Sequence, residues 1–393
     1  MKHTNAHYSD FTNDFRAKSQ KKRSLYGLSL LLPGLLLIFA FAHCGKTGAE
    51  SGNFVVLYAA EDALLIQQNG SETPLSTGSV VPSGATVDSG RAPLDMQSRQ
   101  GATVRLRPYT RVAVSGLENG ARMDMDHGGM VVRVNRRSAD QDFTVVTPTA
   151  IAGVRGTEFD VEDNGTDGAR ITVHSGKVSM RPRVPALERL GSDQIESDPE
   201  LQKLQSTLES REVILEANQQ GSLDMQTVSG IERINSELES NAEGAGSSEI
   251  PADGLQALEN ENAVIKNTIE IDIRSKADLT TLVEVDEDRL AEAESAASDS
   301  DRTQAGQDLE EQYNQRRDAA LDRLNELTGE NPLNSAELKE RYNIIEIVHQ
   351  KSGTITEGAV LTQAGNILVV HTTSGVVRIN TADINYIDLI HVE

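Results

Sequence analysis

Hydrophobic and polar positions alternate over short runs in residues 54 to 185. In the run ATVRLRP, Val104 and Leu106 take one face of an extended chain, and Arg105 and Arg107 take the other. Turn dipeptides such as Asn-Gly and Gly-Gly separate such runs at roughly 8–12-residue intervals. No helix-length apolar stripe interrupts this pattern. We therefore predict an all-β domain, built as a sandwich or as a solenoid.

Residues 186 to 345 change to a spacing of three to four, which is typical of amphipathic helices. Glycine- and serine-rich stretches separate the helical runs, and no heptad pattern lasts beyond two or three repeats, so a long coiled coil has weak support. One interpretation is a solvated helical spacer with partial disorder. The other is a helical hairpin that docks a partner or a second copy. The residues on the predicted apolar faces are Leu201, Leu204, Leu208, Leu215, Ile231, Ile234, Leu238, Ala320, Leu321, Leu324 and Leu327.

Residues 346 to 393 return to a strand-and-turn pattern. Five short runs rich in β-branched residues are separated by Ser-Gly and Ala-Gly-Asn turns. Their number and size predict a small all-β barrel, with an Sm-like or SH3-like meander as the simplest arrangement. A chain this short has little core of its own, and packing on the first module would enlarge it.

An apolar stretch, residues 25 to 42, follows a cluster of basic residues near the N-terminus. This order is typical of an export signal, and the stretch is also long enough for an uncleaved membrane span. Cys44 comes directly afterwards, and the arrangement resembles a bacterial lipoprotein lipobox of the spirochaete kind. That resemblance implies lipidation of Cys44 and removal of residues 1 to 43. Under both interpretations the residues after 44 lie outside the cytoplasm and are anchored to the membrane.

Charge divides the chain in the same way as the hydrophobic pattern does. The chain holds 37 Lys and Arg against 60 Asp and Glu, a net charge of -23, and nearly all of the excess lies in residues 186 to 345. Such an acidic chain is a poor partner for nucleic acid, because phosphate binding needs a basic surface. Aromatic residues make up 4% and tryptophan is absent, which favours several small modules over one large core.

Candidate catalytic chemistry is sparse. The motifs G-x-S-x-G, H-E-x-x-H and C-x-x-C are absent, and Gly176-Lys177 lacks the remainder of a P-loop. Asp124, Asp126 and His127 form a weak candidate for a metal-binding turn, but their spacing is not that of an EF-hand. We therefore predict a protein without catalytic activity, cofactor or metal.

The stretch TPTAIAGVRGTEFDV places a cation in a glycine-hinged corner. Pro148 ends a strand because it has no N–H to donate. Gly153 and Gly156 permit the backbone angles of a tight corner. Arg155 has five donors in a rigid fork, so we expect it to staple the corner, with Glu158 as a plausible partner. An anion-binding Arg155 and a catalytic Arg155 are the alternatives.

The same stretch resembles the FecR domain, whose hallmark is TPxAxxGVRGTxF followed by a strand of pattern x-x-G-x-V. The resemblance covers residues 60 to 181, about a third of the chain. It implies a β-rich extracytoplasmic domain of solenoid character, and the founding members of the family relay a signal from an outer-membrane receptor to a sigma factor. The residues that carry the motif, for corner formation or docking, are Thr147, Pro148, Gly153, Val154, Arg155, Gly156, Thr157, Glu158 and Phe159.

One departure from the founding members concerns the region before the apolar stretch. FecR-type sigma regulators carry a sizeable cytoplasmic domain there, and this chain has 24 residues, too few to bury a core. We therefore predict a membrane-anchored extracytoplasmic lipoprotein that serves as a non-catalytic binding or scaffolding module of the bacterial envelope. The predicted parts are a signal peptide or anchor (1–43), a FecR-like β domain (54–185), an acidic helical spacer (186–345) and a small β-barrel (346–393).

The expected partners are the membrane, envelope proteins or a cell-wall component, and further copies of the chain through the helical spacer. Two alternatives remain. A transmembrane signalling regulator would relay to a sigma factor through its N-terminal residues. A peptidoglycan- or carbohydrate-binding protein would need a cleft with paired carboxylates or a sugar-stacking platform, and the low aromatic content argues against the latter.

Overall fold

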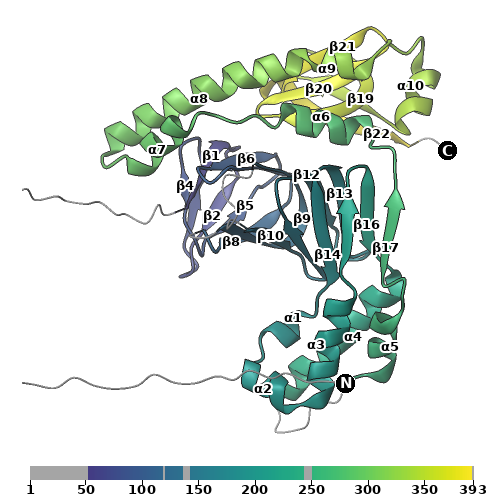
Figure 1. Ribbon diagram of the computed structural model, residues 1–393. Coiled ribbons are helices and arrows are strands. Elements are labelled where there is room, and N and C mark those ends of the chain that lie inside the picture. The colour runs from purple at the N-terminus through teal and green to yellow at the C-terminus, as the bar shows by residue number, and fades with distance from the viewer. Residues whose placement is uncertain (1–51, 118–119, 136–141, 243–249, 392–393) are drawn as a thin grey trace, which may run out of the picture. The chain divides into compact units, whose positions relative to one another are not determined.

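The computed structural model describes residues 52–117, 120–135, 142–242 and 250–391, which fall in one compact unit, Gly48–Glu393 (Figure 1). The predicted export signal and Cys44 lie outside the described residues. Within the described ranges, no helix combines the length and the apolar character needed to cross a membrane.

The main β-region has two groups of strands that share β9 (Gly120–Val134). The neighbours in each group are antiparallel, except that β10 runs parallel to β9. The first group contains, in spatial order, β4 (Val80–Val81), β1 (Phe54–Tyr58), β6 (Leu94–Ser98), β7 (Ala102–Leu106), β9, β12 (Glu158–Asp163), β13 (Ala169–Ser175), β16 (Gln219–Leu223) and β17 (Val264–Thr268). The second contains β3 (Glu72–Pro74), β2 (Leu64–Ile66), β5 (Thr86–Asp88), β8 (Arg111–Ser115), β9, β10 (Asp142–Val146), β11 (Ala150–Val154), β14 (Lys177–Pro182) and β15 (Val213–Glu216).

A pair of glycines marks the point where β9 passes from one group to the other. Up to His127 the strand pairs with β8 and β10, and from Gly128 onward it pairs with β7 and β12. Gly128 has a φ of 106°, and a Cβ at this position would lie 2.3 Å from Thr110 Oγ1. The Gly-Gly dipeptide, expected as a turn, is therefore a change of partner inside a continuous strand.

Inward-facing side chains of both groups form one hydrophobic core, which continues into four helices. These are α1 (Pro185–Glu188), α3 (Pro199–Ser210), α4 (Met225–Ala242) and α5 (Ala252–Glu259); the short α2 (Ser192–Ser197) lies between α1 and α3 in the chain. The predicted apolar faces around Leu204 and Ile234 are confirmed as buried helix faces. Leu215 is a correction, because α3 ends at Ser210 and Leu215 lies in β15.

The acidic middle segment also contributes strands, which its helical spacing did not predict. β15 extends the second group beside β14, and β16 and β17 extend the first group beside β13. These strands have only four or five residues each, too few for a period of two to stand out among helical runs. The predicted boundaries at 185 and 345 stay predictions.

β1 is buried on both faces. Phe54 and Val56 contact the main core, whereas Val55 and Leu57 join a second cluster with side chains of α7 (Glu287–Ser295) and α8 (Asp299–Asp322). This explains why the run FVVLY is continuously apolar rather than alternating.

The C-terminal sheet has five antiparallel strands in the order β21-β20-β19-β18-β22. Four helices share its hydrophobic core: α6 (Ile273–Thr281), the end of α8, α9 (Leu324–Thr328) and α10 (Ser335–Tyr342). The mostly β fold with a C-terminal β module is confirmed. Neither a solenoid nor a closed barrel is present in the described ranges, where β21 and β22 end the sheet as unpaired edges. The strands are β18 (Ile344–Gln350), β19 (Ile355–Ala364), β20 (Ile367–Thr372), β21 (Gly375–Asn380) and β22 (Ile384–His391), with the 3-10 helix η1 (Thr381–Asp383) before β22.

Candidate functional site

The predicted glycine-hinged corner lies between β11 and β12. Gly156 has a φ of 61°, which glycine adopts at little cost. Thr157 Oγ1 donates to the carbonyl of Lys177 at 2.9 Å, and a Cβ on Gly176 would lie 2.5 Å from Gly156 O. The Gly176-Lys177 turn therefore packs directly on the corner, which accounts for the glycine of the distal x-x-G-x-V pattern.

Arg155 does not contact its predicted partner. Its guanidinium pairs with Asp142 at 3.2 Å, and the two side chains are 60% and 67% exposed. Glu158 instead accepts from Arg133 Nε at 2.7 Å and from Ser175 Oγ at 3.1 Å. The expected staple between Arg155 and Glu158 is therefore wrong, because the side chain of Arg155 leaves the corner toward solvent.

The other motif residues have structural positions. Thr147 is buried, and its Oγ1 accepts from the N–H of Ala150 at 3.0 Å, just beyond the end of β10. Gly153 lies inside β11 without a positive φ; its small size matters because a Cβ would lie 2.8 Å from Ser179 Oγ. Pro148 is half-buried in the turn between β10 and β11. The side chains of Val154 and Phe159 belong to the main core.

Metal-binding chemistry was a weak candidate at Asp124, Asp126 and His127. These residues lie along β9 rather than in a turn. Asp124 is engaged by Arg122, with the closest contact at 2.8 Å. No group of three or more His, Cys, Asp or Glu side chains suited to a metal occurs within the described residues.

A polar surface covers the outer side of β6, β7 and β9, opposite the main core. Because Val104 and Val132 point into the core, their strand neighbours Arg105 and Arg133 point away from it. Gln97 lies on the same side of β6, through its pairing with Thr103. We call the side chains of Gln97, Arg105, Arg107, Arg133 and Asn135 the docking face.

Arg105 is the most buried charge of this docking face. It forms a bidentate ion pair with Asp95 and donates to Thr281 Oγ1 at 2.8 Å and to the Thr281 carbonyl at 2.9 Å. Burial acts to lower the pKa of Arg105, but the Asp95 carboxylate outweighs it, so the pKa lies above its ordinary value. Tyr313 on α8 donates to Asp95 Oδ2 at 2.7 Å, and burial raises the pKa of this tyrosine well above its usual range.

Three arginines of the docking face surround the C-terminal end of α6. Arg133 donates to the carbonyls of Leu279 at 3.0 Å and Leu282 at 2.6 Å, while Arg107 reaches the Asp278 carboxylate at 3.4 Å. The last carbonyls of a helix lack partners within the helix and carry partial negative charge. The arginines supply both hydrogen-bond donors and positive charge. Side chains of the β-sheet therefore pair with these carbonyls in place of water.

The docking face also holds the extended chain that follows α6. The Gln97 carboxamide forms two hydrogen bonds with the main chain of Val285, and Asn135 Nδ2 donates to the Glu284 carboxylate at 2.7 Å. We call residues 278–286 the docked segment. The face thus binds protein main chain, and its side chains are engaged in hydrogen bonds and ion pairs rather than arranged as a nucleophile with a base.

The sequence pattern indicated the arginines of this face but did not indicate the segment that they bind. The alternation of Arg105 and Arg107 with apolar neighbours placed both cations on one side of a strand. Their partners in the docked segment lie more than 170 positions later, in a stretch whose own signal is the alternation of Val283 and Val285 with acidic residues.

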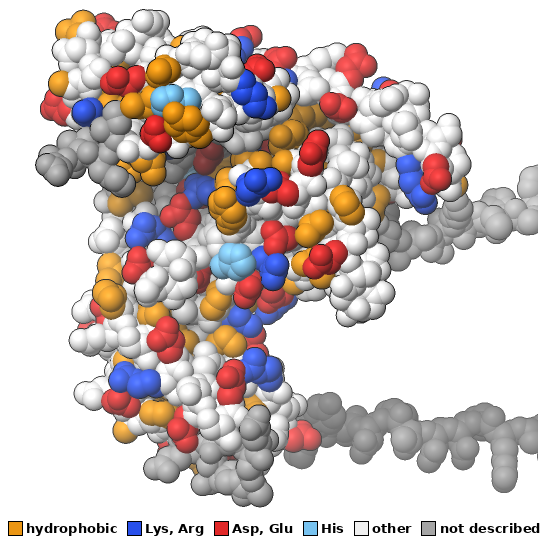
Figure 2. All heavy atoms as spheres, turned by 180° about the vertical axis from the view of Figure 1, so that it is seen from behind, with side chains coloured by type: hydrophobic (Ala, Val, Ile, Leu, Met, Phe, Trp, Pro, Cys, Tyr) orange, Lys and Arg blue, Asp and Glu red, His pale blue; other side chains and the backbone are white. Residues whose placement is uncertain are grey.

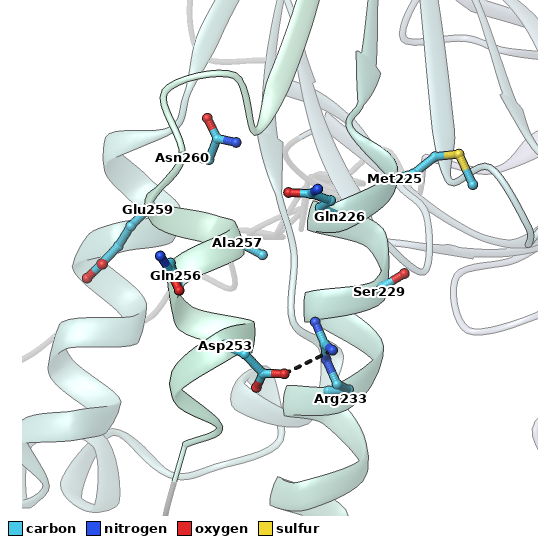
Figure 3. Close-up of a pocket in the computed structure, with 9 residues that line it drawn as sticks. All are labelled: Met225, Gln226, Ser229, Arg233, Asp253, Gln256, Ala257, Glu259 and Asn260. Atoms are coloured by element: carbon cyan, nitrogen blue, oxygen red, sulfur yellow. Dashed lines mark ion pairs between the residues drawn. The ribbon is translucent and has the colours of Figure 1, made fainter.

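A second feature is a hollow of about 750 Å³ between α4 and α5 (Figure 3). The two helices touch through Gly230 and Gly254, where an added Cβ at Gly230 would lie 3.0 Å from Gly254 O. An Arg233–Asp253 ion pair of 2.9 Å crosses the hollow. The remaining lining is mostly amide and hydroxyl groups, which exchange hydrogen bonds with neutral polar molecules; it includes Gln226, Ser229, Gln256 and Asn260.

Exposed apolar side chains gather on the C-terminal sheet (Figure 2, upper left). They lie at its β22 edge and the adjoining β18 and β19: Ile344, Ile355, Tyr386, Ile387 and Leu389. Tyr386 stacks on His349 with ring centroids 4.2 Å apart.

Comparison with known proteins finds a similarity over part of the β-region. Residues 85–179 match the FecR protein family. No curated protein matches the chain. Two crystal structures of a Parabacteroides distasonis protein, provisionally assigned as an anti-sigma factor, are 16% and 17% identical to it, with TM-scores of 0.27 and 0.23. The matches cover 38% and 34% of this chain, and 64% and 57% of the solved chains.

The chain thus spans less than two thirds of the length of these solved structures. Their TM-scores are too low for the likeness to show a shared fold. The family match is confined to residues 85–179.

Proposed function

We propose, from the match of residues 85–179 to the FecR protein family, that this protein is a non-catalytic binding or scaffolding component of the bacterial envelope. In this proposal the chain is held outside the cytoplasm by a lipid on Cys44. The FecR domain supplies the binding surface, and the acidic helical segment and the C-terminal sheet are fixed to it.

The docking face is the observation that carries this proposal. Arg105, Arg133 and Gln97 all bind main-chain groups of another part of the chain. Side chains that hydrogen-bond to main-chain groups bind a protein segment without changing it chemically. A surface built for protein contact fits a docking role better than a catalytic one.

The first experiment is a cross-linking pull-down of the full-length, membrane-anchored protein from its own cells, with captured species identified by mass spectrometry. Recovery of envelope proteins, wall fragments or further copies of the chain supports the binding role. A bait with Arg155→Ala serves as a matched variant, since Arg155 is the exposed cation of the FecR motif. Capture of no envelope component above an untagged control would refute the proposal.

The anchor is tested separately by metabolic labelling with a fatty-acid analogue. We expect wild-type protein to take up label and to fractionate with membranes, and Cys44→Ser to lose the label because it lacks the thiol. Label retained by Cys44→Ser would contradict lipidation at this residue.

A signalling regulator is the second candidate, and the family match is the observation that favours it. Specific capture of a sigma factor through residues 1–24 would establish this function in place of the scaffold. Deleting residues 2–18, which leaves the basic cluster at 21–23 and the apolar stretch intact, would then abolish that capture alone.

A further inference from the structure

The end of the docked segment, residues 282–286 (Leu-Val-Glu-Val-Asp), lies between side chains of the FecR domain and side chains of α8, and we call the space that it fills the groove. Gln97 Nε2 donates to the Val285 carbonyl at 3.0 Å, and its Oε1 accepts from the Val285 N–H at 2.7 Å. A carboxamide has one donor and one acceptor side by side, so it pairs with an extended residue as a neighbouring strand would. Arg133 binds the Leu282 carbonyl on the same wall.

The opposite wall is α8, and it also binds main-chain groups. Arg316 Nη1 donates to the Glu284 carbonyl at 2.7 Å. Gln312 Oε1 accepts from the Asp286 N–H at 2.9 Å, and its Nε2 donates to the Asp286 carboxylate at 2.6 Å. Four main-chain groups of residues 284–286 thus meet side-chain partners from the two walls.

The floor of the groove is apolar and holds two side chains of the segment. Val283 and Val285 are 7% and 4% exposed and belong to the apolar cluster around β1 and Tyr313. The intervening Glu284 carboxylate points outward to Asn135. Val283 and Val285 therefore enter the floor while Glu284 between them faces a polar group, which is the pattern of an extended peptide laid on a surface.

We propose that this groove is a peptide-recognition site filled in cis by residues 282–286, and that it binds in trans an extended partner segment of the form Val-acidic-Val. The inference rests on the proposed binding function and names its partner class. Main-chain contacts are common to any extended peptide, so the two apolar residues and the acidic residue between them supply the selectivity.

The cis segment competes with any external peptide. It is continuous with α6 and α7, so its effective concentration at the groove is at least on the order of millimolar, and an external peptide binds only to the fraction of molecules whose groove is open. Weakening the cis segment enlarges this fraction and raises the apparent affinity for the external peptide in proportion.

The test titrates a fluorescent peptide of residues 280–288, TTLVEVDED, into the full chain and follows anisotropy. We expect the variant Val283→Asp/Val285→Asp to bind the peptide at least about tenfold more tightly than wild type, because its cis segment no longer fits the apolar floor. A peptide with the same two substitutions serves as the matched control and should not bind. Adding Gln97→Ala to the variant should weaken peptide binding by about tenfold, since two main-chain hydrogen bonds are lost.

A shape-conserving variant, Val283→Thr/Val285→Thr, covers the case in which two aspartates unfold the protein. Hydrogen exchange then verifies that residues 282–286 open while β6 and β7 stay protected. The proposal would be overturned if a folded variant with an open groove bound TTLVEVDED no more tightly than it bound the substituted peptide. A dimer that depends on Val283 and Val285, seen by light scattering, would overturn it in favour of exchange between two copies. If the pull-down recovers envelope proteins but the peptide does not bind, the groove proposal is refuted and the proposed binding function is retained.

Discussion

Arg105 and Asp95 face each other across β6 and β7 in a bidentate ion pair, with Nε–Oδ1 and Nη2–Oδ2 distances of 2.7 and 2.8 Å. Both side chains are 1% exposed. Tyr313 and Thr281 complete the hydrogen bonds of the pair from α8 and α6, so one buried ion pair connects the FecR domain to two helices that follow it. An ion pair this deeply buried is costly to break from one side.

We expect Asp95→Ala to lower the free energy of unfolding by about 3–5 kcal/mol, because it leaves the Arg105 charge buried without a counter-ion. Urea unfolding of the full chain at neutral pH measures this loss. The double variant Asp95→Ala/Arg105→Ala should cost less than the sum of the two single changes, since their effects are coupled. Additive losses would mean that the two charges do not stabilise one another.

Arg155→Ala should change the free energy of unfolding by no more than about 1 kcal/mol, because its ion pair with Asp142 is exposed to solvent. The thermal midpoint of the full chain, compared with Asp95→Ala, provides the measurement. A large loss of stability would restore the corner-staple interpretation. Unchanged stability with reduced capture of envelope partners would mark Arg155 as a contact residue.

Gly230→Ala should destabilise the contact between α4 and α5 by about 1–3 kcal/mol, because the added Cβ meets Ala257 Cβ at 2.9 Å and Gly254 O at 3.0 Å. Urea unfolding followed by circular dichroism reports the change. Ser229→Ala, one position earlier on an exposed surface, is the matched control and should be neutral or slightly stabilising through helix propensity. Equal free energies of unfolding for the two variants would show that the helices move apart to accommodate the added Cβ at little cost.

Acid should destabilise the C-terminal sheet through His371. Burial lowers the pKa of His371, with Arg341 adding to the effect, and its Nδ1 is hydrogen-bonded to the Tyr342 hydroxyl. Below an ordinary histidine pKa of about 6.5 the unfolded chain binds a proton that the folded chain resists, so stability falls as the pH drops toward the folded pKa.

The thermal midpoint between pH 7.5 and 5.5 should therefore fall less steeply in His371→Gln than in wild type. His127→Gln, a surface substitution, should keep the wild-type slope. Identical slopes in all three proteins would exclude His371 as the group responsible.

Local patterns were sufficient for much of the fold. The alternation of Val104 and Leu106 with arginines predicted a strand, and the spacing of Leu201, Leu204 and Leu208 predicted a buried helix face. The glycine-hinged corner was recognisable because Gly156 needs a positive φ and its neighbours form the strands on either side. Each of these features depends on residues within a few positions of one another.

The candidate site was only half predictable. Sequence placed Arg105 on the polar side of its strand. Packing across the chain brings to it Thr281, which accepts from Arg105, and Tyr313, which donates to its counter-ion Asp95. The same holds for Glu158, whose closest cation is Arg133 on the neighbouring strand rather than Arg155 three positions away. A corner between two strands directs adjacent side chains to opposite sides, so nearness in sequence was a poor guide to contact.

The sequence by itself determined the strand and helix periods, the FecR motif and the acidic character of the middle segment. The tertiary structure alone decided that β9 is one strand shared by two groups, that β15 to β17 extend the main sheets, and that the docked segment covers the arginines of β7 and β9. The physical reason is that secondary structure follows from local hydrogen bonding and side-chain period. Which buried polar groups meet depends instead on the whole chain, because each of them must find a partner once water is excluded.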